Sequence, residues 1–233
     1  MLMKVLLLFK RIPGAQLAEP LARKLLKTPK LAFNDSETYW QERYQKGGTS
    51  GTGSYGRLAK FKADTLNRFV AENNIDTVLE LGCGDGNQLA LAEYPSYIGL
   101  DISDIAIKVC SDKFSGDTTK SFLHYLDHIN DKYDLTLSLD VIYHLVEDHI
   151  FENYMAKLFD NSGRFVIIYS SNYDEYSEDS PHVKHRRFTD WIELNRKDWR
   201  IIANLENPFK FDDKYPSQTS RADFFIFQNL HII

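Results

Sequence analysis

From about residue 57 onward, two kinds of hydrophobic pattern alternate along the chain. Four segments carry apolar residues at helical spacing, which predicts amphipathic helices, at 57–73, 87–94, 103–114 and 147–159. Five short apolar runs between them predict buried strands, at 75–81, 97–101, 121–126, 133–140 and 164–171. Strands that alternate with helices favour an α/β fold, with a parallel sheet covered by helices on both faces.

The last part of the chain follows a different order. Residues 188–196 read as a helix, and the two apolar runs at 199–208 and 222–230 follow without a helix between them. Such neighbours favour antiparallel pairing, so we expect them at one edge of the sheet. The pattern therefore predicts a mostly parallel seven-stranded sheet with an antiparallel edge strand.

Composition narrows the class of protein. The chain has 233 residues, of which 43% are hydrophobic and 13% aromatic, enough for the core of one large domain. The net charge of −5 argues against broad nucleic-acid binding, which needs a basic face. The two cysteines cannot form a disulfide framework or a four-thiolate zinc site, which favours a reducing, cytoplasmic location.

The N-terminal segment differs from the rest in charge. Residues 1–30 contain seven basic residues and one acid, and residues 17–26 have apolar residues at helical spacing. We therefore expect residues 1–34 to be a basic helical extension that docks on the main domain or leads from an upstream partner. A helix on a membrane surface is the alternative. The apolar run at 5–9 is too short to span a bilayer, and no transmembrane segment is expected elsewhere.

The strongest chemical signal is the sequence VLELGCGDGN at 78–87, in which a buried strand runs into a glycine-rich turn. Glycines at such a turn let a ligand approach the backbone closely. The spacing is Gly-x-Gly-x-Gly after an acid, whereas dinucleotide enzymes use Gly-x-Gly-x-x-Gly. The next strand ends in Asp101, and a carboxylate there can accept two hydrogen bonds from a ribose diol. An ordinary tight turn is the alternative interpretation.

This motif resembles motif I of class I S-adenosylmethionine-dependent methyltransferases, which have a Rossmann-like fold. The resemblance implies S-adenosylmethionine as cofactor and S-adenosylhomocysteine as product. It implies that the acid before the loop supports the cofactor's amino-acid end and that the loop lies along methionine and ribose. It also implies that the acid at the end of the next strand holds the ribose hydroxyls, and that an acid after the third strand meets the adenine. The implied residues are Glu80, Gly82, Cys83, Gly84, Gly86, Asp101 and Asp127.

The end of the fourth predicted strand carries candidates for catalysis. Asp140 and His144 are four residues apart at this point, where the family places the methyl acceptor. A hydroxyl acceptor is a weak nucleophile and benefits from a base, and histidine is the commonest one. His182 and His185, in the long polar segment 170–191, are alternative bases. The Asn/Asp-Pro-Pro-aromatic motif of many nitrogen methyltransferases is absent here, which favours an oxygen acceptor.

The segment 170–191 is also expected to form a wall of the acceptor site, because loops of this length are usually functional. Its rings, Tyr173 and Tyr176, suit stacking on a sugar. Some O-methyltransferases bind Mg²⁺ through an acid after strand four and an acid–amide pair after strand five. Asp140 with Asn172 or Asp174 imitates that arrangement, so Mg²⁺ or Mn²⁺ is a further possibility.

Five stretches together resemble one bacterial-type group of these methyltransferases: 39–67, 80–89, 97–103, 137–148 and 182–191. Members often occur beside glycosyltransferases of surface-polysaccharide synthesis, which implies a sugar hydroxyl in a glycan as acceptor. The alternatives are a small metabolite, a protein side chain, or a non-catalytic cofactor-binding partner subunit. A nicotinamide-dependent oxidoreductase is disfavoured by the glycine spacing.

The stretch GGTSGTGSYG at 47–56 holds five of the twelve glycines. It imitates a phosphate-binding loop but lacks the lysine that would meet the phosphates. Aromatic residues precede it and an amphipathic helix follows, so we expect residues 39–56 to form a flap over the cofactor pocket. Tyr44, Gly53 and Ser54 are then candidates to contact the cofactor's methionine or to line the acceptor site. An exposed loop between two helices is the alternative.

Overall fold

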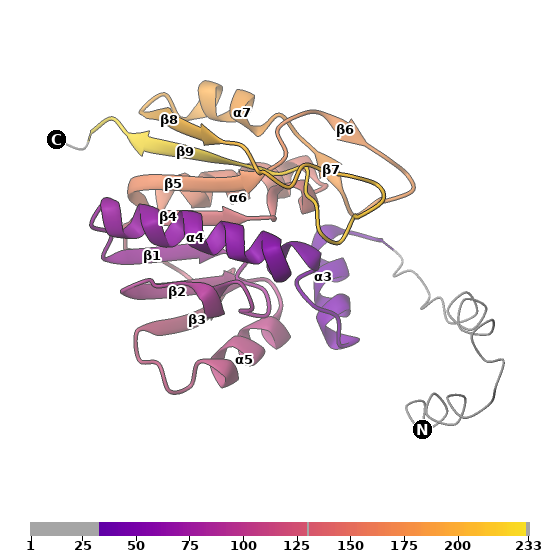
Figure 1. The fold of residues 1–233 in the computed structure, drawn as a ribbon, viewed down its shortest axis with the longest axis horizontal. Helices are drawn as coiled ribbons and strands as arrows, with labels where there is room; N and C mark the ends of the chain where they lie inside the picture. Colours follow the sequence, from indigo (N-terminus) through magenta and orange to yellow (C-terminus); the bar gives the residue numbers. More distant parts are fainter. Residues whose placement is uncertain (1–32, 130, 232–233) are drawn as a thin grey trace. The chain divides into compact units, whose positions relative to one another are not determined.

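The computed structural model describes residues 33–129 and 131–231, and most of the predicted basic extension lies outside them. A seven-stranded sheet forms the centre, in the order β3-β2-β1-β4-β5-β9-β8 (Figure 1). Its strands, in chain order, are β1 (Thr77–Leu81), β2 (Ser96–Asp101), β3 (Lys120–His124), β4 (Tyr133–Leu139), β5 (Ser162–Ser170), β8 (Trp199–Leu205) and β9 (Asp223–Asn229).

The strand directions confirm the predicted topology. Strands β1 to β5 pair parallel with one another, and β9 pairs antiparallel with both β5 and β8. The two apolar runs that lack a helix between them are therefore the antiparallel pair at one edge of the sheet. Because the order reverses at β1 and β4, the carboxyl ends of these two strands form a topological switch point, where such sheets bind ligands.

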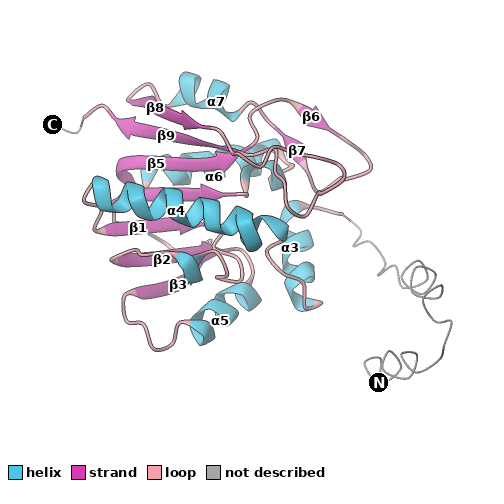
Figure 2. Ribbon diagram, in the orientation of Figure 1, coloured by secondary structure: helices cyan, strands magenta, loops and turns pink. Residues whose placement is uncertain are grey.

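Helices cover both faces of the sheet (Figure 2). One hydrophobic cluster joins the sheet to α4 and α5, and a second joins it to α6 and α7. Strand β5 supplies both clusters, with Ile167 in the first and Val166 and Ile168 in the second, as the period of two in a strand requires. These helices are α4 (Gly56–Glu72), α5 (Asp104–Lys113), α6 (Asp148–Asp160) and α7 (Phe188–Asn195).

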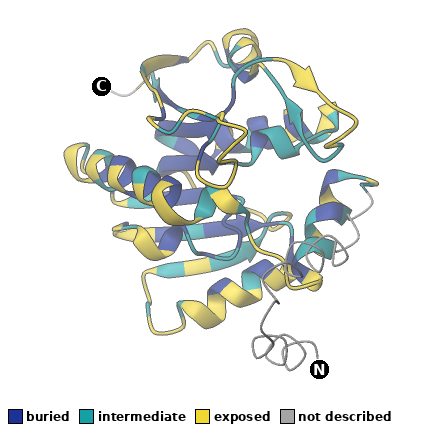
Figure 3. Cartoon of the chain, turned by 45° about the vertical axis from the view of Figure 1, so that its right-hand side comes forward, coloured by how far each residue is buried: buried dark blue, intermediate teal, exposed yellow. Residues whose placement is uncertain are grey.

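Local signals explain several helix boundaries. The Ser103 side chain accepts a hydrogen bond from the Ala106 N–H and so caps α5, as its sequence predicts. Helix α4 is buried along one side and exposed along the other (Figure 3), which agrees with its amphipathic pattern. Both helices thus form where the hydrophobic periodicity places them.

The prediction of a helix at 87–94 is wrong, because this segment forms only a short 3₁₀ turn at Leu89–Leu91. The Asn67 side chain on α4 donates to the Leu91 carbonyl and accepts from the Glu93 N–H. These backbone groups are thereby satisfied by a side chain of another element rather than by a following helical turn. A long-range contact decides the conformation here, so the local pattern misleads.

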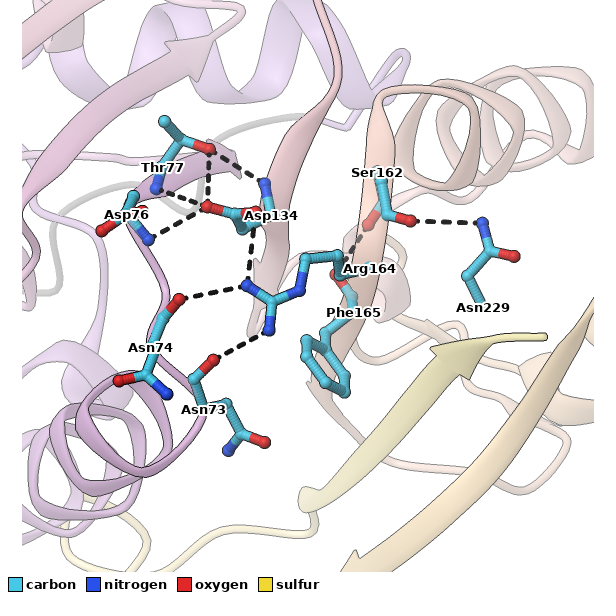
Figure 4. A network of polar contacts seen from close by, with 10 residues as sticks. Asn73, Asn74, Asp76, Thr77, Asp134, Ser162, Arg164, Phe165 and Asn229 are labelled. Atoms are coloured by element: carbon cyan, nitrogen blue, oxygen red, sulfur yellow. Dashed lines mark hydrogen bonds and ion pairs between the residues drawn. The ribbon is translucent and has the colours of Figure 1, made fainter. Parts of the chain in front are cut away.

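Polar contacts at the amino-terminal ends of the strands tie β1, β4 and β5 together (Figure 4). The Asp134 carboxylate on β4 accepts hydrogen bonds from the N–H groups of Asp76 and Thr77 at the start of β1. Arg164 on β5 donates to the Asn74 carbonyl and pairs with Asp134 at 3.4 Å. This end of the sheet thus has a structural role, and the opposite end is left for a ligand.

Two further elements lie beyond the carboxyl ends of the parallel strands (Figure 1). Helix α3 (Ser36–Gln45) precedes the glycine stretch, and the small hairpin of β6 (Glu175–Tyr176) and β7 (Lys184–His185) lies in the segment after β5. Among the described residues, no helix is both long and apolar enough to cross a membrane.

Candidate active site

A cavity opens at the carboxyl ends of β1, β2 and β4, where the sheet order reverses. Its walls come from the glycine-rich turn, the strand ends, helix α3 and the start of α6. The predicted site residues among its lining are Tyr44, Ser54, Glu80, Gly82, Cys83, Gly84, Asp101, Asp140 and His144. The fold therefore brings most of the predicted site residues together in one place.

The glycine turn has the backbone shape that its sequence requires. Gly82, Gly84 and Gly86 all have positive φ, at 90°, 61° and 66°. The Asp101 carboxylate accepts hydrogen bonds from the N–H groups of Gly84 and Ser103, each at 2.9 Å. Burial raises the pKa of Asp101 to about 6, although these hydrogen bonds oppose the shift. Asp101 thus fixes the loop and keeps a carboxylate in the cavity wall.

Glu80 lies at the inner end of the cavity and is almost fully buried. Its carboxylate accepts a hydrogen bond of 2.8 Å from the Tyr97 hydroxyl. Burial raises the pKa of Glu80 to about 7, while Tyr97 and the nearby Lys62 ammonium oppose the rise. A buried carboxylate with a raised pKa favours a ligand that brings a positive charge or hydrogen-bond donors.

The glycine stretch before α4 is docked on the glycine turn through Asp85. The Asp85 carboxylate accepts hydrogen bonds from the Ser50 N–H at 3.0 Å and from the Tyr55 hydroxyl at 2.8 Å. The Asn87 amide donates to the Ser54 carbonyl at 2.6 Å. A Cβ on Gly84 would lie 2.2 Å from the Ser50 Oγ, so the two segments touch closely. Residues 49–55 are therefore held against the glycine-rich turn.

Helix α3 lies over the cavity and is fixed at its first residue. The Glu147 carboxylate accepts hydrogen bonds from both the N–H and the hydroxyl of Ser36, at 3.0 and 2.6 Å. Further along the helix, the Tyr39 ring stacks on His182 at 4.6 Å, and the Trp40 ring meets His144 edge-on at 4.9 Å. Tyr44, near its end, shares a hydrogen bond with Ser50. The helix thus joins the cofactor loop to the predicted acceptor wall.

Asp140 occupies an unusual backbone conformation directly after β4. Its φ is +61°, which is rare for a residue other than glycine and is typical of functional sites. Its carboxylate accepts hydrogen bonds from the Lys62 ammonium at 2.5 Å and from the Tyr143 hydroxyl at 2.9 Å. Gly53 packs on the same carboxylate, because a Cβ there would lie 2.7 Å from Oδ2. Asp140 is therefore enclosed by α4, by Gly53 and by its own turn.

His144 faces the cavity with a defined tautomer. Its Nδ1 lies 3.1 Å from the His182 carbonyl oxygen, which can only accept, so Nδ1 carries the proton. The lone pair is then on Nε2. Burial lowers the pKa of His144 to about 4, although the hydrogen bond to the carbonyl opposes this. The ring is thus neutral near pH 7 with a free lone pair on Nε2, and its lowered pKa makes it a weaker base than an exposed histidine.

The two histidines predicted as alternative bases, His182 and His185, do not line the cavity. The carbonyl of His182 orients His144, and its ring stacks between those of Tyr39 and His144. His185 lies on β7, with Nδ1 2.6 Å from the Ser171 hydroxyl and its ring stacked on Tyr173 at 4.7 Å. These positions favour a supporting role for both histidines in the acceptor wall.

Three residues that were predicted to bind the cofactor do not line the cavity. Asp127 is exposed, and its carboxylate accepts from the His124 N–H within its own turn. Gly86 packs against Cys110 and Phe114 behind the loop, and Gly53 packs on Asp140. The wall nearest to Asp127 is instead formed by Tyr125 and Leu126, which line the cavity.

The residues of the metal hypothesis are engaged elsewhere. Asn172 exchanges hydrogen bonds with Thr189 near the start of α7, and the Asp174 carboxylate accepts from the Arg187 N–H. Asp140 is paired with Lys62. Within residues 33–129 and 131–231, no group of three or more His, Cys, Asp or Glu side chains is arranged to bind a metal ion.

Several residues of this site were missed by the sequence analysis: Lys62, Trp40, Ser50 and Asp85. Lys62 had a detectable signal, because a lysine at 62 falls on the same helical face as Leu58 and Leu66, which are buried. Trp40, Ser50 and Asp85 gave no comparable signal, since their partners lie far away in the sequence.

The chain resembles known proteins at the level of a family. A family model described as "Methyltransferase domain" matches residues 55–203, which is more than half of the chain. No curated protein matches the chain.

Solved structures share the fold at low sequence identity. The methyltransferase domain of bacterial CtHen1 is 20% identical, covering 72% of this chain and 96% of its own, with a TM-score of 0.56. Magnesium protoporphyrin IX methyltransferase from Synechocystis PCC 6803, with bound SAM, is 16% identical over 84% and 97%, with a TM-score of 0.59. The N-methyltransferase NodS from Bradyrhizobium japonicum WM9, with bound S-adenosyl-L-homocysteine, is 11% identical over 74% and 87%, with a TM-score of 0.57. At these identities the likeness shows a common fold.

Proposed function

Because the chain belongs to the methyltransferase domain family, we propose that it is an S-adenosylmethionine-dependent O-methyltransferase acting on a sugar hydroxyl of a glycan or polysaccharide. The observation that carries the cofactor assignment is the joining of the glycine turn and Asp101 in one cavity at the switch point. The finer assignment, a sugar oxygen as acceptor, has separate support.

The charges of the cavity suit this cofactor. Four acids line it, at Glu37, Glu80, Asp101 and Asp140, together with one lysine, Lys62. When bound, S-adenosylmethionine supplies a methyl group on a positively charged sulfur, which an acidic cavity favours. We assign Asp101 to the ribose hydroxyls, Glu80 and the turn to the amino-acid end, and Tyr125 and Leu126 to the adenine.

The acceptor end is assigned to the turn after β4. His144 presents Nε2 as a proton acceptor, and the Asp140 carboxylate, four residues earlier, is a second candidate base. In the transfer, the acceptor oxygen bonds to the methyl carbon, the carbon–sulfur bond breaks with its electron pair going to sulfur, and the hydroxyl proton leaves to a base. His144 is our first choice for that base and Asp140 the second.

The shape of the acceptor end supports a carbohydrate. Trp40 lines the cavity beside His144, while Tyr39 and Tyr173 hold the rings of His182 and His185. Aromatic faces and carboxylates suit the two faces and the hydroxyls of a sugar ring. The resemblance to a group found beside glycosyltransferases points the same way. A small metabolite or a protein side chain is the alternative acceptor, and a non-catalytic cofactor-binding subunit is the alternative role.

We assign residues 39–56 to a flap that covers bound cofactor. Its contacts with Asp85 and Gly84 support this role, since it closes over the turn that would hold the ligand. A test is amide hydrogen exchange with and without S-adenosylhomocysteine, in which Gly53 and Ser54 should gain protection. Equal exchange in both states would mean that the segment is only a linker.

The direct test of the function is calorimetry with S-adenosylhomocysteine, NAD and NADP. We expect binding of the first alone, and binding of a dinucleotide instead would overturn the assignment. A methylation assay over a panel of glycosides, read by mass spectrometry, tests the acceptor. Transfer to a peptide or small metabolite, with none to any glycoside, would contradict the sugar assignment while leaving the cofactor assignment intact.

A further inference from the structure

Lys62 is a buried charge that has no role in the proposed methyl transfer. Its side chain is only 1% exposed, and it reaches from the apolar face of α4 into the cavity. Its ammonium lies 2.5 Å from Asp140 Oδ2 and near enough to Glu80 to act on that carboxylate. One lysine thus pairs with Asp140 and also acts on the carboxylate of Glu80 in the same cavity.

Such a pair is not explained by stability. Removing two charges from water costs several kcal/mol per ion, and a well-packed apolar pair of the same size is often at least as stable. Asp140 is in addition held in a left-handed conformation, which is strained for a residue other than glycine. A charged pair kept at such a position in a cavity wall is typical of a functional site.

The surrounding charges indicate what Lys62 can bind. Among the described residues that line the cavity, Lys62 is the only lysine or arginine, whereas four are acids. A ligand with an amino-acid end brings one carboxylate into this acidic space. That carboxylate is repelled by every charged neighbour except Lys62, so Lys62 is the group that can neutralise it.

We propose that Lys62 is an exchangeable partner, which neutralises Asp140 in the empty cavity and turns to the α-carboxylate of the bound cofactor. The proposal rests on the proposed function and deepens it by naming a binding residue. Asp140 Oδ2 then loses its lysine and becomes available to accept a hydrogen bond from the acceptor hydroxyl, while Tyr143 still holds Oδ1. Cofactor binding thereby prepares the acceptor end.

Two ligands distinguish the contact between Lys62 and the cofactor's carboxylate from the contacts made by the rest of the cavity. S-Adenosylhomocysteine carries the amino-acid end, and 5′-methylthioadenosine has the same nucleoside without it. Two variants are compared: Asp140→Asn, which leaves the Lys62 ammonium without its acid partner, and the double variant Lys62→Met with Asp140→Asn, which removes both charges of the pair. Their melting temperatures confirm folding, and calorimetry gives the dissociation constants of both ligands.

The exchange predicts a specific order of affinities. Asp140→Asn should bind S-adenosylhomocysteine as tightly as the natural protein or up to about tenfold more tightly, because Lys62 no longer has to leave a carboxylate. The double variant should bind it about 10- to 100-fold more weakly than Asp140→Asn, the range for a lost hydrogen bond to a charge. Binding of 5′-methylthioadenosine should be the same in all three proteins.

Three results would overturn the exchange. They are weaker S-adenosylhomocysteine binding in Asp140→Asn itself, equal binding of it by the two variants, and a parallel loss of both ligands in the double variant. Failure of the natural protein to bind either ligand would instead contradict the proposed function, so the two failures are distinguishable.

Discussion

The buried carboxyl of Glu80 should make the stability of this protein depend on pH in an identifiable way. Its pKa is raised from the ordinary value of 4.5 to about 7 by burial. The folded protein therefore binds this proton more tightly than the unfolded chain does. Unfolding releases the proton between about pH 4.5 and pH 7, so stability falls as the pH rises through that window.

The size of the effect follows from the shift. A pKa of about 7 against the ordinary value of 4.5 corresponds to a stabilisation of a few kcal/mol at acid pH, which is lost in full above pH 7. Most of the Glu80 contribution should be lost between pH 5 and pH 8. Such a contribution is a large part of the 5–15 kcal/mol that typically stabilises a domain.

The perturbation is Glu80→Gln, which removes the titration and keeps an oxygen to accept from the Tyr97 hydroxyl. Free energies of unfolding from urea titrations at pH 5, 6, 7 and 8 would be compared with those of the natural protein. Other groups titrate in both proteins, so the difference between the two curves isolates Glu80. Parallel curves over this range would refute the reasoning, because they would mean that folding does not shift this pKa.

Three further predictions concern ligand binding and catalysis. His144→Ala should lower kcat by roughly 10² or more and leave the affinity for S-adenosylhomocysteine unchanged, since the ring serves the acceptor end; an unaltered rate would move the role of base to Asp140. Gly84→Ala should destabilise the fold by about 2 kcal/mol or more and abolish cofactor binding, because its Cβ would collide with the Ser50 hydroxyl at a φ of +61°; normal binding in calorimetry would contradict this. The affinity for S-adenosylhomocysteine should fall as the pH drops below about 6, where Asp101 becomes protonated; Asp101→Asn should lack that dependence, and an identical pH profile would argue against Asp101 as the ribose ligand.

The acid–lysine arrangement also bears on product release. Transfer of the methyl group removes the positive charge from sulfur, and the cavity keeps its four acids and one lysine. The product is therefore held by one favourable charge interaction fewer than the substrate, which helps it to leave. On the proposed flap role of residues 39–56, their hydrogen bonds to Asp85 are the contacts that would have to break for the product to leave.

The sequence by itself determined those features that arise from local periodicity and from the chemistry of single turns. Alternating apolar patterns predicted all seven strands of the sheet and its antiparallel pair, because the burial of one face of an element leaves its period in the sequence. The glycine turn was also predictable, since the positive φ values and the close backbone approach require glycine. Asp101 was expected because an acid at the end of the next strand can accept hydrogen bonds from a ribose diol.

Only the tertiary structure decided how distant groups meet. The segment 87–94 has a helical pattern, yet Asn67 on another helix satisfies its backbone and ends it after one turn. Lys62 and Asp140 are 78 residues apart, and the carbonyl that orients His144 belongs to His182, 38 residues away. A local pattern carries no record of such partners, because each contact depends on the packing of whole elements. The sequence therefore predicted which residues gather at the carboxyl ends of the strands, and the tertiary structure decided which charges meet there.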